Sequence, residues 1–192
     1  MAIPKLTESE KIIRVASGFK LIMETLGLDT KDASLKDTPL RVAKMYVKEI
    51  CGGLVAEPPK LTSFPNPGYS QMVVVKDINV SSLCEHHFVP FIGKCHIAYI
   101  PGKSVVGLSK FSRTVQHFSA KPQVQERLTH EVASYLIKGL KNEDVAVVME
   151  CKHLCCGIRG AKDPDAITVS AAINGKFVEQ AVREEFYKLI GK

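Results

Sequence analysis

The sequence predicts an α+β fold in which an antiparallel sheet carries helices on one face. Two helical patterns come first, and the order strand, strand, helix, helix, strand, strand, helix follows them. Paired strands around paired helices are typical of such a layered architecture. With 192 residues, 45% of them hydrophobic, the chain can bury a core without disulfide bonds. We expect an N-terminal helical region and connector over residues 1–70, and a sheet-bearing domain over residues 71–192.

The N-terminal region contains start and stop signals for two helices. The first helix should begin where Thr7 and Glu10 have capping-box spacing, and Gly27 is a suitable stop. The apolar residues between them recur with the spacing of one helical face. A threonine followed by Pro39 starts the second helix, which should run through residues 41–50.

The connector over residues 57–69 carries four prolines and a glycine, so we expect it to be extended. Four strands with open edges should follow, and proteins usually pair or cover such edges. The chain is therefore expected to form a homo-oligomer that continues the sheet between subunits. The strands are expected at 72–80, 88–100, 144–151 and 166–173, and the helices at 108–120, from about 122, and at 178–190.

Charge and hydropathy narrow the class of partner. The net charge of +6 fits either a solvated basic surface or a small polyanion such as a nucleotide. The positive residues are spread along the chain, which argues against a long nucleic acid. No apolar run approaches the roughly 20 residues that span a membrane, and charges interrupt the N-terminus. We therefore expect a cytoplasmic protein whose six cysteines are ligands, nucleophiles or core residues.

Two clusters of cysteine and histidine indicate a zinc site. Each cluster follows an expected strand, so the sheet could bring them together. Thiolate and imidazole are the donors that zinc prefers. The alternative is a pair of buried cysteines with surface histidines, since cysteine is often buried for packing alone. The candidate ligands are Cys84, His86, His87, Cys151, His153, Cys155 and Cys156.

The spacing favours a catalytic over a structural metal site. A structural zinc typically shows a second close-spaced pair such as Cys-x-x-Cys, which this sequence lacks. The adjacent Cys155 and Cys156 point differently and can hardly both reach one ion. Three protein ligands would leave a position for water, whose pKa zinc lowers to about 7. Spacing alone leaves the choice of ligands open.

Three further motifs have both a functional and an ordinary explanation. Lys110 and Arg113 share a face near a helix N-terminus, which suits either a phosphate chain or a solvated basic surface. Gln125 and Glu126 could read the donor edge of guanine, or belong to an ordinary acidic first turn. Arg159 could bind phosphate or simply occupy a turn.

Together these motifs resemble GTP cyclohydrolase I. They occur in the order of that family and cover residues from about 35 to 175. The combination of CEHH with GLSK and PQVQER is highly specific. The matching segments are DTPLRVAKMY at 37–46, CEHHFVPF at 84–91, AYIPGKSVVGLSK at 98–110, KPQVQERLT at 121–129, and the stretch His153-x-Cys155-x-x-x-Arg159-Gly160.

The resemblance implies a role for each candidate residue. It places the zinc ligands on Cys84, His87 and Cys155, and the proton-transfer histidines on His86 and His153. Guanine contacts fall on Gln125 and Glu126, and triphosphate contacts on Ser109, Lys110, Arg113 and Arg159. It also implies the tunnelling fold (T-fold), whose ββααββ unit assembles into an oligomeric barrel. Members form homodecamers of two pentamers with active sites at subunit boundaries.

The reaction implied is the zinc-dependent hydrolysis and rearrangement of GTP. Activated water attacks C8, formate leaves, and the product is 7,8-dihydroneopterin triphosphate, the first intermediate of folate or tetrahydrobiopterin synthesis. Cys151, Cys156 and Gly157 depart from the family pattern around the second cluster. Two other hypotheses are a related tunnelling-fold enzyme, such as one similar to pyruvoyl-pterin synthase, and a non-catalytic zinc-stabilised module.

Overall fold

The computed structural model describes residues 6–192. The chain folds into two compact units. The first unit ends at Leu54 and the second covers Val55–Lys192. The expected connector therefore belongs to the second unit. None of the helices formed by the described residues is long and apolar enough to cross a membrane.

The first unit begins with helix α1, Glu8–Thr25. Its capping box is formed as predicted, because the backbone N–H of Glu10 donates to Oγ1 of Thr7 and the backbone N–H of Thr7 donates to the Glu10 carboxylate. These two bonds satisfy donors that the first helical turn leaves free. Past the helix end, Gly27 has a φ of +81°, a conformation that favours glycine.

The second helix of this unit differs slightly from its prediction. Helix α2 spans Thr38–Lys44, and its N-cap is Asp37, one residue before the predicted cap. The chain continues as a π-helix over Met45–Ile50 and a short 3₁₀ helix over Gly52–Leu54. The predicted range through residue 50 is thus helical throughout, with a wider turn in its second half.

The second unit contains a five-stranded sheet in the order β5-β2-β3-β6-β7 and a separate pair, β1-β4. Strands β2, β3, β6 and β7 are antiparallel neighbours, as predicted. The short strands β1, β4 and β5 were not predicted. The strands are β1 Ser63–Pro65, β2 Val73–Cys84, β3 Pro90–Tyr99, β4 Ser104–Val106, β5 Pro122–Gln123, β6 Val145–His153 and β7 Thr168–Ile173.

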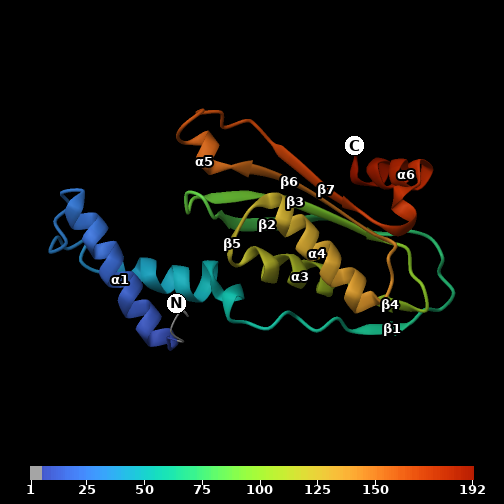
Figure 1. Ribbon diagram of the computed structural model, residues 1–192, viewed down its shortest axis with the longest axis horizontal. Helices are drawn as coiled ribbons and strands as arrows, with labels where there is room; N and C mark the ends of the chain where they lie inside the picture. Colours follow the sequence, from blue (N-terminus) through green and yellow to red (C-terminus); the bar gives the residue numbers. More distant parts are fainter. Residues whose placement is uncertain (1–5) are drawn as a thin grey trace, which may run out of the picture. The chain divides into compact units, whose positions relative to one another are not determined.

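Helices cover both faces of the sheet, so the predicted single helical face was wrong. Val147 and Met149 of β6 pack in one core cluster with residues of α3 and α4, whereas Ala146 and Val148 pack in another with Phe186 of α6. Figure 1 shows α6 and the α3–α4 pair on opposite sides of the sheet. The helices are α3 Ser109–Ser119, α4 Gln125–Leu140, α5 Leu154–Gly157, a 3₁₀ turn at Gly175–Val178, and α6 Gln180–Ile190.

Strand β2 extends four residues beyond its predicted end, and this extension positions the first cysteine cluster. Its pairing with β3 shifts register between Val75 and Ile78, where Asp77 has a φ of +62°. After that bulge the ladder continues to Leu83, and Cys84 is the last residue of the strand. The predicted end at residue 80 was too early because the polar residues that follow still pair with β3.

Candidate active site

The sheet brings the two cysteine clusters to one end. Cys84 ends β2, and Cys155 lies in α5, directly after β6. Strand β3 joins them, since Phe91 pairs with Ser82 on one side and His153 on the other. Figure 1 shows this end of the sheet beside α5.

Cys84, His87 and Cys155 converge as a group that could hold a metal ion. Their three ligand atoms all lie within 4.8 Å of one another. Cys84 and Cys155 are buried, whereas His87 is exposed, so the group opens towards solvent on one side. Three ligands with an open side match the requirements of a catalytic metal site.

A tight turn carries His87 back towards the cysteines. The backbone N–H of Phe88 donates to the Cys84 carbonyl at 2.9 Å, and the N–H of Cys84 donates to the Val89 carbonyl at 2.9 Å. Phe88 has a φ of +53°, which is costly for a bulky residue. The turn therefore stores strain next to the metal-binding group, as functional sites often do.

The other thiols in the second cluster have different surroundings. Cys151 is 1% exposed and packs in the core beneath α3 and α4, and burial raises its pKa to about 12. Cys156 is exposed and does not belong to the converging group. Burial raises the pKa of the Cys155 thiol, and a hydrogen bond with Cys84 raises it further. A bound cation would oppose both effects by favouring the thiolate.

The two histidines expected to transfer protons lie beside this group. Nδ1 of His86 is 3.9 Å from Sγ of Cys84, and its side chain is exposed. His153 is half-buried, and its ring stacks on Phe91 with centroids 4.8 Å apart. Burial lowers the pKa of His153, whereas the nearby Glu126 carboxylate raises it. A histidine whose neutral form is favoured can accept a proton near neutral pH.

Gln125 and Glu126, the expected guanine contacts, have contrasting environments. Glu126 is exposed at the start of α4. Gln125 is 1% exposed, and its side-chain oxygen lies 2.8 Å from Nε2 of His153. Its side-chain nitrogen donates to the carbonyls of Met149 and Thr168. The amide of Gln125 is thus already bonded within the protein, whereas the Glu126 carboxylate can face a ligand.

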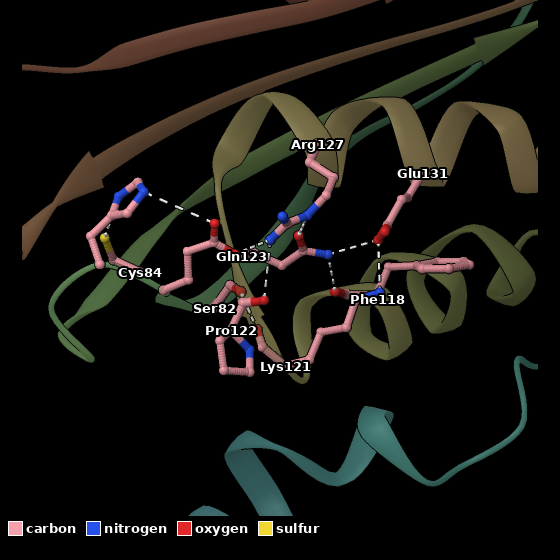
Figure 2. A network of polar contacts seen from close by, with 10 residues as sticks. Ser82, Cys84, Phe118, Lys121, Pro122, Gln123, Arg127 and Glu131 are labelled. Carbon is pink, nitrogen blue, oxygen red and sulfur yellow. Dashed lines mark hydrogen bonds and ion pairs between the residues drawn. The ribbon is translucent and has the colours of Figure 1, made fainter. Parts of the chain in front are cut away.

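A second polar network lies beside the turn that carries His87 (Figure 2). The buried Gln123 donates from its side-chain nitrogen to Glu131 at 2.7 Å, and its side-chain oxygen accepts from Nε of Arg127 at 2.8 Å. Arg127 in turn pairs with the Glu85 carboxylate, and the N–H of Glu85 donates to the Gln123 carbonyl at 3.0 Å. The network links the residue after Cys84 to β5 and α4.

No motif in the sequence indicated this network. Gln123, Arg127 and Glu131 follow one another at intervals of four residues, which could have indicated a shared helical face. Gln123 lies before the helix, however, and Glu85 is distant in sequence. Their meeting depends on the parallel pairing of β5 with β2, which no local pattern predicted.

The expected phosphate contacts lie on two separate segments. Ser109, Lys110 and Arg113 occupy the first turns of α3, and Arg159 lies after α5. Among residues 6–192, the ion pairs do not involve Lys110, Arg113 or Arg159, so their charges are available to a ligand. Helix α3 leads from Ser109 towards β5 beside Cys84, and its length of about 16 Å separates its first turn from that end.

Comparison with known proteins supports the assignment that the motifs suggested. The sequence profile of GTP cyclohydrolase I matches residues 15–191. The chain belongs to the GTP cyclohydrolase I family. It is an enzyme of this family, and the converging Cys84, His87 and Cys155 lie within the matched region.

Several curated bacterial members of the family are similar over most of the chain. GTP cyclohydrolase 1 of Flavobacterium johnsoniae is 47% identical over 96% of this chain and 84% of its own length. The enzyme of a Sulfurihydrogenibium species is 49% identical over 92% of this chain and 94% of its own. The apo structure of the archaeosine synthase QueF-Like aligns at 15% identity with a TM-score of 0.44, over 53% of this chain and 90% of its own. A score at that level supports no argument about the fold.

Proposed function

We propose that this enzyme converts GTP and water to 7,8-dihydroneopterin triphosphate and formate, the first step of pterin biosynthesis. The convergence of Cys84, His87 and Cys155 on one open-sided site carries the proposal. Membership of the GTP cyclohydrolase I family supports the substrate and the class of reaction.

Zn²⁺ is the metal that we propose for this site. Two thiolates and one imidazole are the donor set that zinc prefers, and a fourth position would stay open. A zinc ion held by these residues would act as a Lewis acid and make water nucleophilic at neutral pH. The exposed side of the group, at His87, would let the substrate approach an ion held there.

His86 and His153 are proposed to move the protons. Attack at C8 and opening of the imidazole ring require proton delivery to nitrogen and, later, to sugar oxygen. His153 emerges from the end of β6, two residues before Cys155, and stacks on Phe91, so its ring is held in one orientation. His86 is exposed beside Cys84 and would act from that position.

The remaining residues are proposed to bind the nucleotide. The Glu126 carboxylate would accept hydrogen bonds from the N1–H and amino groups of guanine, with Gln125 forming the wall of the base pocket. Lys110, Arg113 and Arg159, with Ser109 beside them, would bind the triphosphate. Fixed cations suit such a polyanion because charge-assisted hydrogen bonds are the stronger kind.

We propose that the active site forms between subunits of a homo-oligomer, a decamer of two pentamers. Two observations support this. Strand β7 is an edge strand with exposed apolar residues, including Val169 at 61% exposure. The first turn of α3 lies about one helix length, roughly 16 Å, from the end beside Cys84, so a neighbouring subunit's α3 could supply the phosphate contacts. Sedimentation as a monomer at micromolar concentration would rule the assembly out.

The test is direct. The zinc-loaded protein should release formate from GTP and yield a fluorescent pterin after oxidation. Cys155→Ser should lose both metal and activity. His153→Ala should keep the metal while kcat falls by about 10²- to 10⁴-fold. Zinc-loaded protein that releases no formate would overturn the proposal, and loss of metal from His153→Ala would make His153 a ligand instead.

A further inference from the structure

The side-chain amide of Gln125 has only one orientation that satisfies its neighbours. Its terminal nitrogen lies 3.1 Å from the carbonyl of Met149, 2.9 Å from that of Thr168 and 3.0 Å from Oγ of Ser170. Two of these partners are carbonyls, which can only accept hydrogen bonds. The atom that faces them must therefore be the NH₂ group, and the oxygen must face His153.

That orientation determines which nitrogen of His153 carries the proton in the neutral ring. The Gln125 oxygen lies 2.8 Å from Nε2 of His153 and can only accept. Nε2 must then be protonated, and the lone pair of the neutral imidazole resides on Nδ1. Stacking on Phe91, with an interplanar angle of 12°, resists the ring flip that would exchange the two nitrogens.

The hydroxyl groups of the buried Thr129 and the half-buried Ser170 hold Gln125 in place. Oγ1 of Thr129 donates to the Gln125 backbone carbonyl at 2.8 Å and lies 2.7 Å from Oγ of Ser170. The Thr129 hydroxyl has one proton, which it donates to that carbonyl, so the hydroxyl of Ser170 must donate to Oγ1 of Thr129. The Ser170 oxygen is then free to accept from the Gln125 amide. The backbone and side chain of Gln125 are thus tied into one ring of hydrogen bonds.

We propose that Gln125 is a positioning residue that holds the His153 ring with Nε2–H bonded to the Gln125 oxygen, which leaves Nδ1 as the ring nitrogen available to the substrate. This inference rests on the proposed role of His153 in proton transfer.

A double-mutant cycle between Gln125 and His153 tests the proposal. Gln125→Met fills the same space without polar atoms and should lower kcat by about 10- to 100-fold, with the KM for GTP nearly unchanged. In the His153→Ala background the same substitution should lower kcat no further, because its effect on kcat acts through His153. Zinc content and the thermal midpoint establish that each variant is folded. Gln125→Asn, which withdraws the oxygen by one methylene, replaces Gln125→Met if the latter does not fold.

Gln123→Met is the matched control. Gln123 is another fully buried glutamine, but its amide bonds with Phe118 and Glu131 and not with His153. Any fold-loss in kcat caused by Gln123→Met should therefore be independent of His153. In the double variant it should multiply the fold-loss caused by His153→Ala.

The outcomes distinguish a failure of the proposed role of His153 from a failure of the positioning role of Gln125. Full activity in His153→Ala would defeat the proposed function of His153 itself. A large loss in His153→Ala with unchanged kcat in Gln125→Met or Gln125→Asn would overturn only the positioning role. The positioning role would also be overturned if the fold-losses in kcat of the Gln125 and His153 variants multiply in the double variant, or if only the KM rises. Either result would show that Gln125 acts directly on the substrate.

Discussion

The guanidinium group of Arg127, in the first turn of α4, is paired with the carboxylate of Glu85, the residue that follows Cys84. The pair connects the turn that carries His87 to a helix on the other side of β5. The same carboxylate lies 4.0 Å from Nε2 of His86. One ion pair therefore restrains the turn that carries His87 and lies close to a proposed proton carrier.

Removing this pair should weaken metal binding without removing a ligand. We expect Arg127→Met to lower the affinity for Zn²⁺ by about 10- to 100-fold, as is typical when groups that orient ligands are lost. Competition with a chromogenic chelator would measure it. Lys176→Met, which removes an exposed ion pair with Asp144, is the control and should leave the affinity unchanged. Equal affinities in Arg127→Met and the unaltered enzyme would contradict this role.

The choice among the thiols of the second cluster can be tested at adjacent positions. Cys155→Ser should abolish stoichiometric zinc binding, because Cys155 lies in the converging group. Cys156→Ser should retain one zinc per chain, since Cys156 is exposed and outside that group. Metal content after gel filtration, measured by mass spectrometry, decides between them. Loss of zinc from Cys156→Ser and not from Cys155→Ser would reverse the assignment.

Cys151 should make the stability of the fold depend on pH in the alkaline range. Burial raises its pKa from about 9 to about 12, so the folded protein holds this proton more tightly than the unfolded chain. The contribution is full below pH 9 and is lost as the pH rises towards 12, by up to about 1.4 kcal/mol per pH unit.

Cys151→Ala removes this ionisation. Urea unfolding at pH 8, 9 and 10 should therefore show a shallower loss of stability in the variant than in the unaltered protein. If the free energy of unfolding fell equally with pH in both proteins, the fold would not raise the pKa of this thiol.

Gly93 is required by the close approach of β3 and β6. A Cβ atom at this position would lie 1.9 Å from the carbonyl oxygen of Glu150, a backbone atom that cannot move without breaking the ladder. Gly93→Ala should therefore lower the free energy of unfolding by about 3 kcal/mol or more. Gly18→Ala on α1, where a Cβ meets nothing within 4 Å, should instead raise it by about 0.5–1 kcal/mol. Thermal unfolding of both variants would test the contrast.

Glu126 should determine the preference for guanine. Glu126→Gln keeps the shape but exchanges one acceptor oxygen for a donor that faces the donors of the base. A lost hydrogen bond to a charged group costs about 1.5–3 kcal/mol, roughly 10- to 150-fold in kcat/KM for GTP. Inosine triphosphate lacks the 2-amino group, so Glu126→Gln should lower kcat/KM less for this nucleotide than for GTP. An equal fall for both nucleotides would show that Glu126 does not read that group.

Much of the architecture followed from local patterns. The capping box of Thr7 and Glu10 forms as its spacing predicts, because both bonds lie within one turn of helix. The four main strands and their antiparallel arrangement in one sheet were also predicted. The helix on the second face was not, because the buried run Val145–Met149 shows no alternation that would reveal which residues face α6. Strand β5 is only two residues long and pairs with a partner far away in sequence.

By itself, the sequence determined the residue types of the site and the family to which the chain belongs, because CEHH, GLSK and PQVQER are contiguous motifs. Spacing alone left seven candidate ligands, the family resemblance pointed to Cys84, His87 and Cys155, and nothing in the sequence linked Gln125 with His153. The tertiary structure brings those three side chains together as a group that could hold a metal, and it joins Gln125 to His153 and Arg127 to Glu85. These relationships depend on strand register and on the turn after β2, which bring together atoms that are distant in sequence. The spacing of residues does not reveal which way their side chains point.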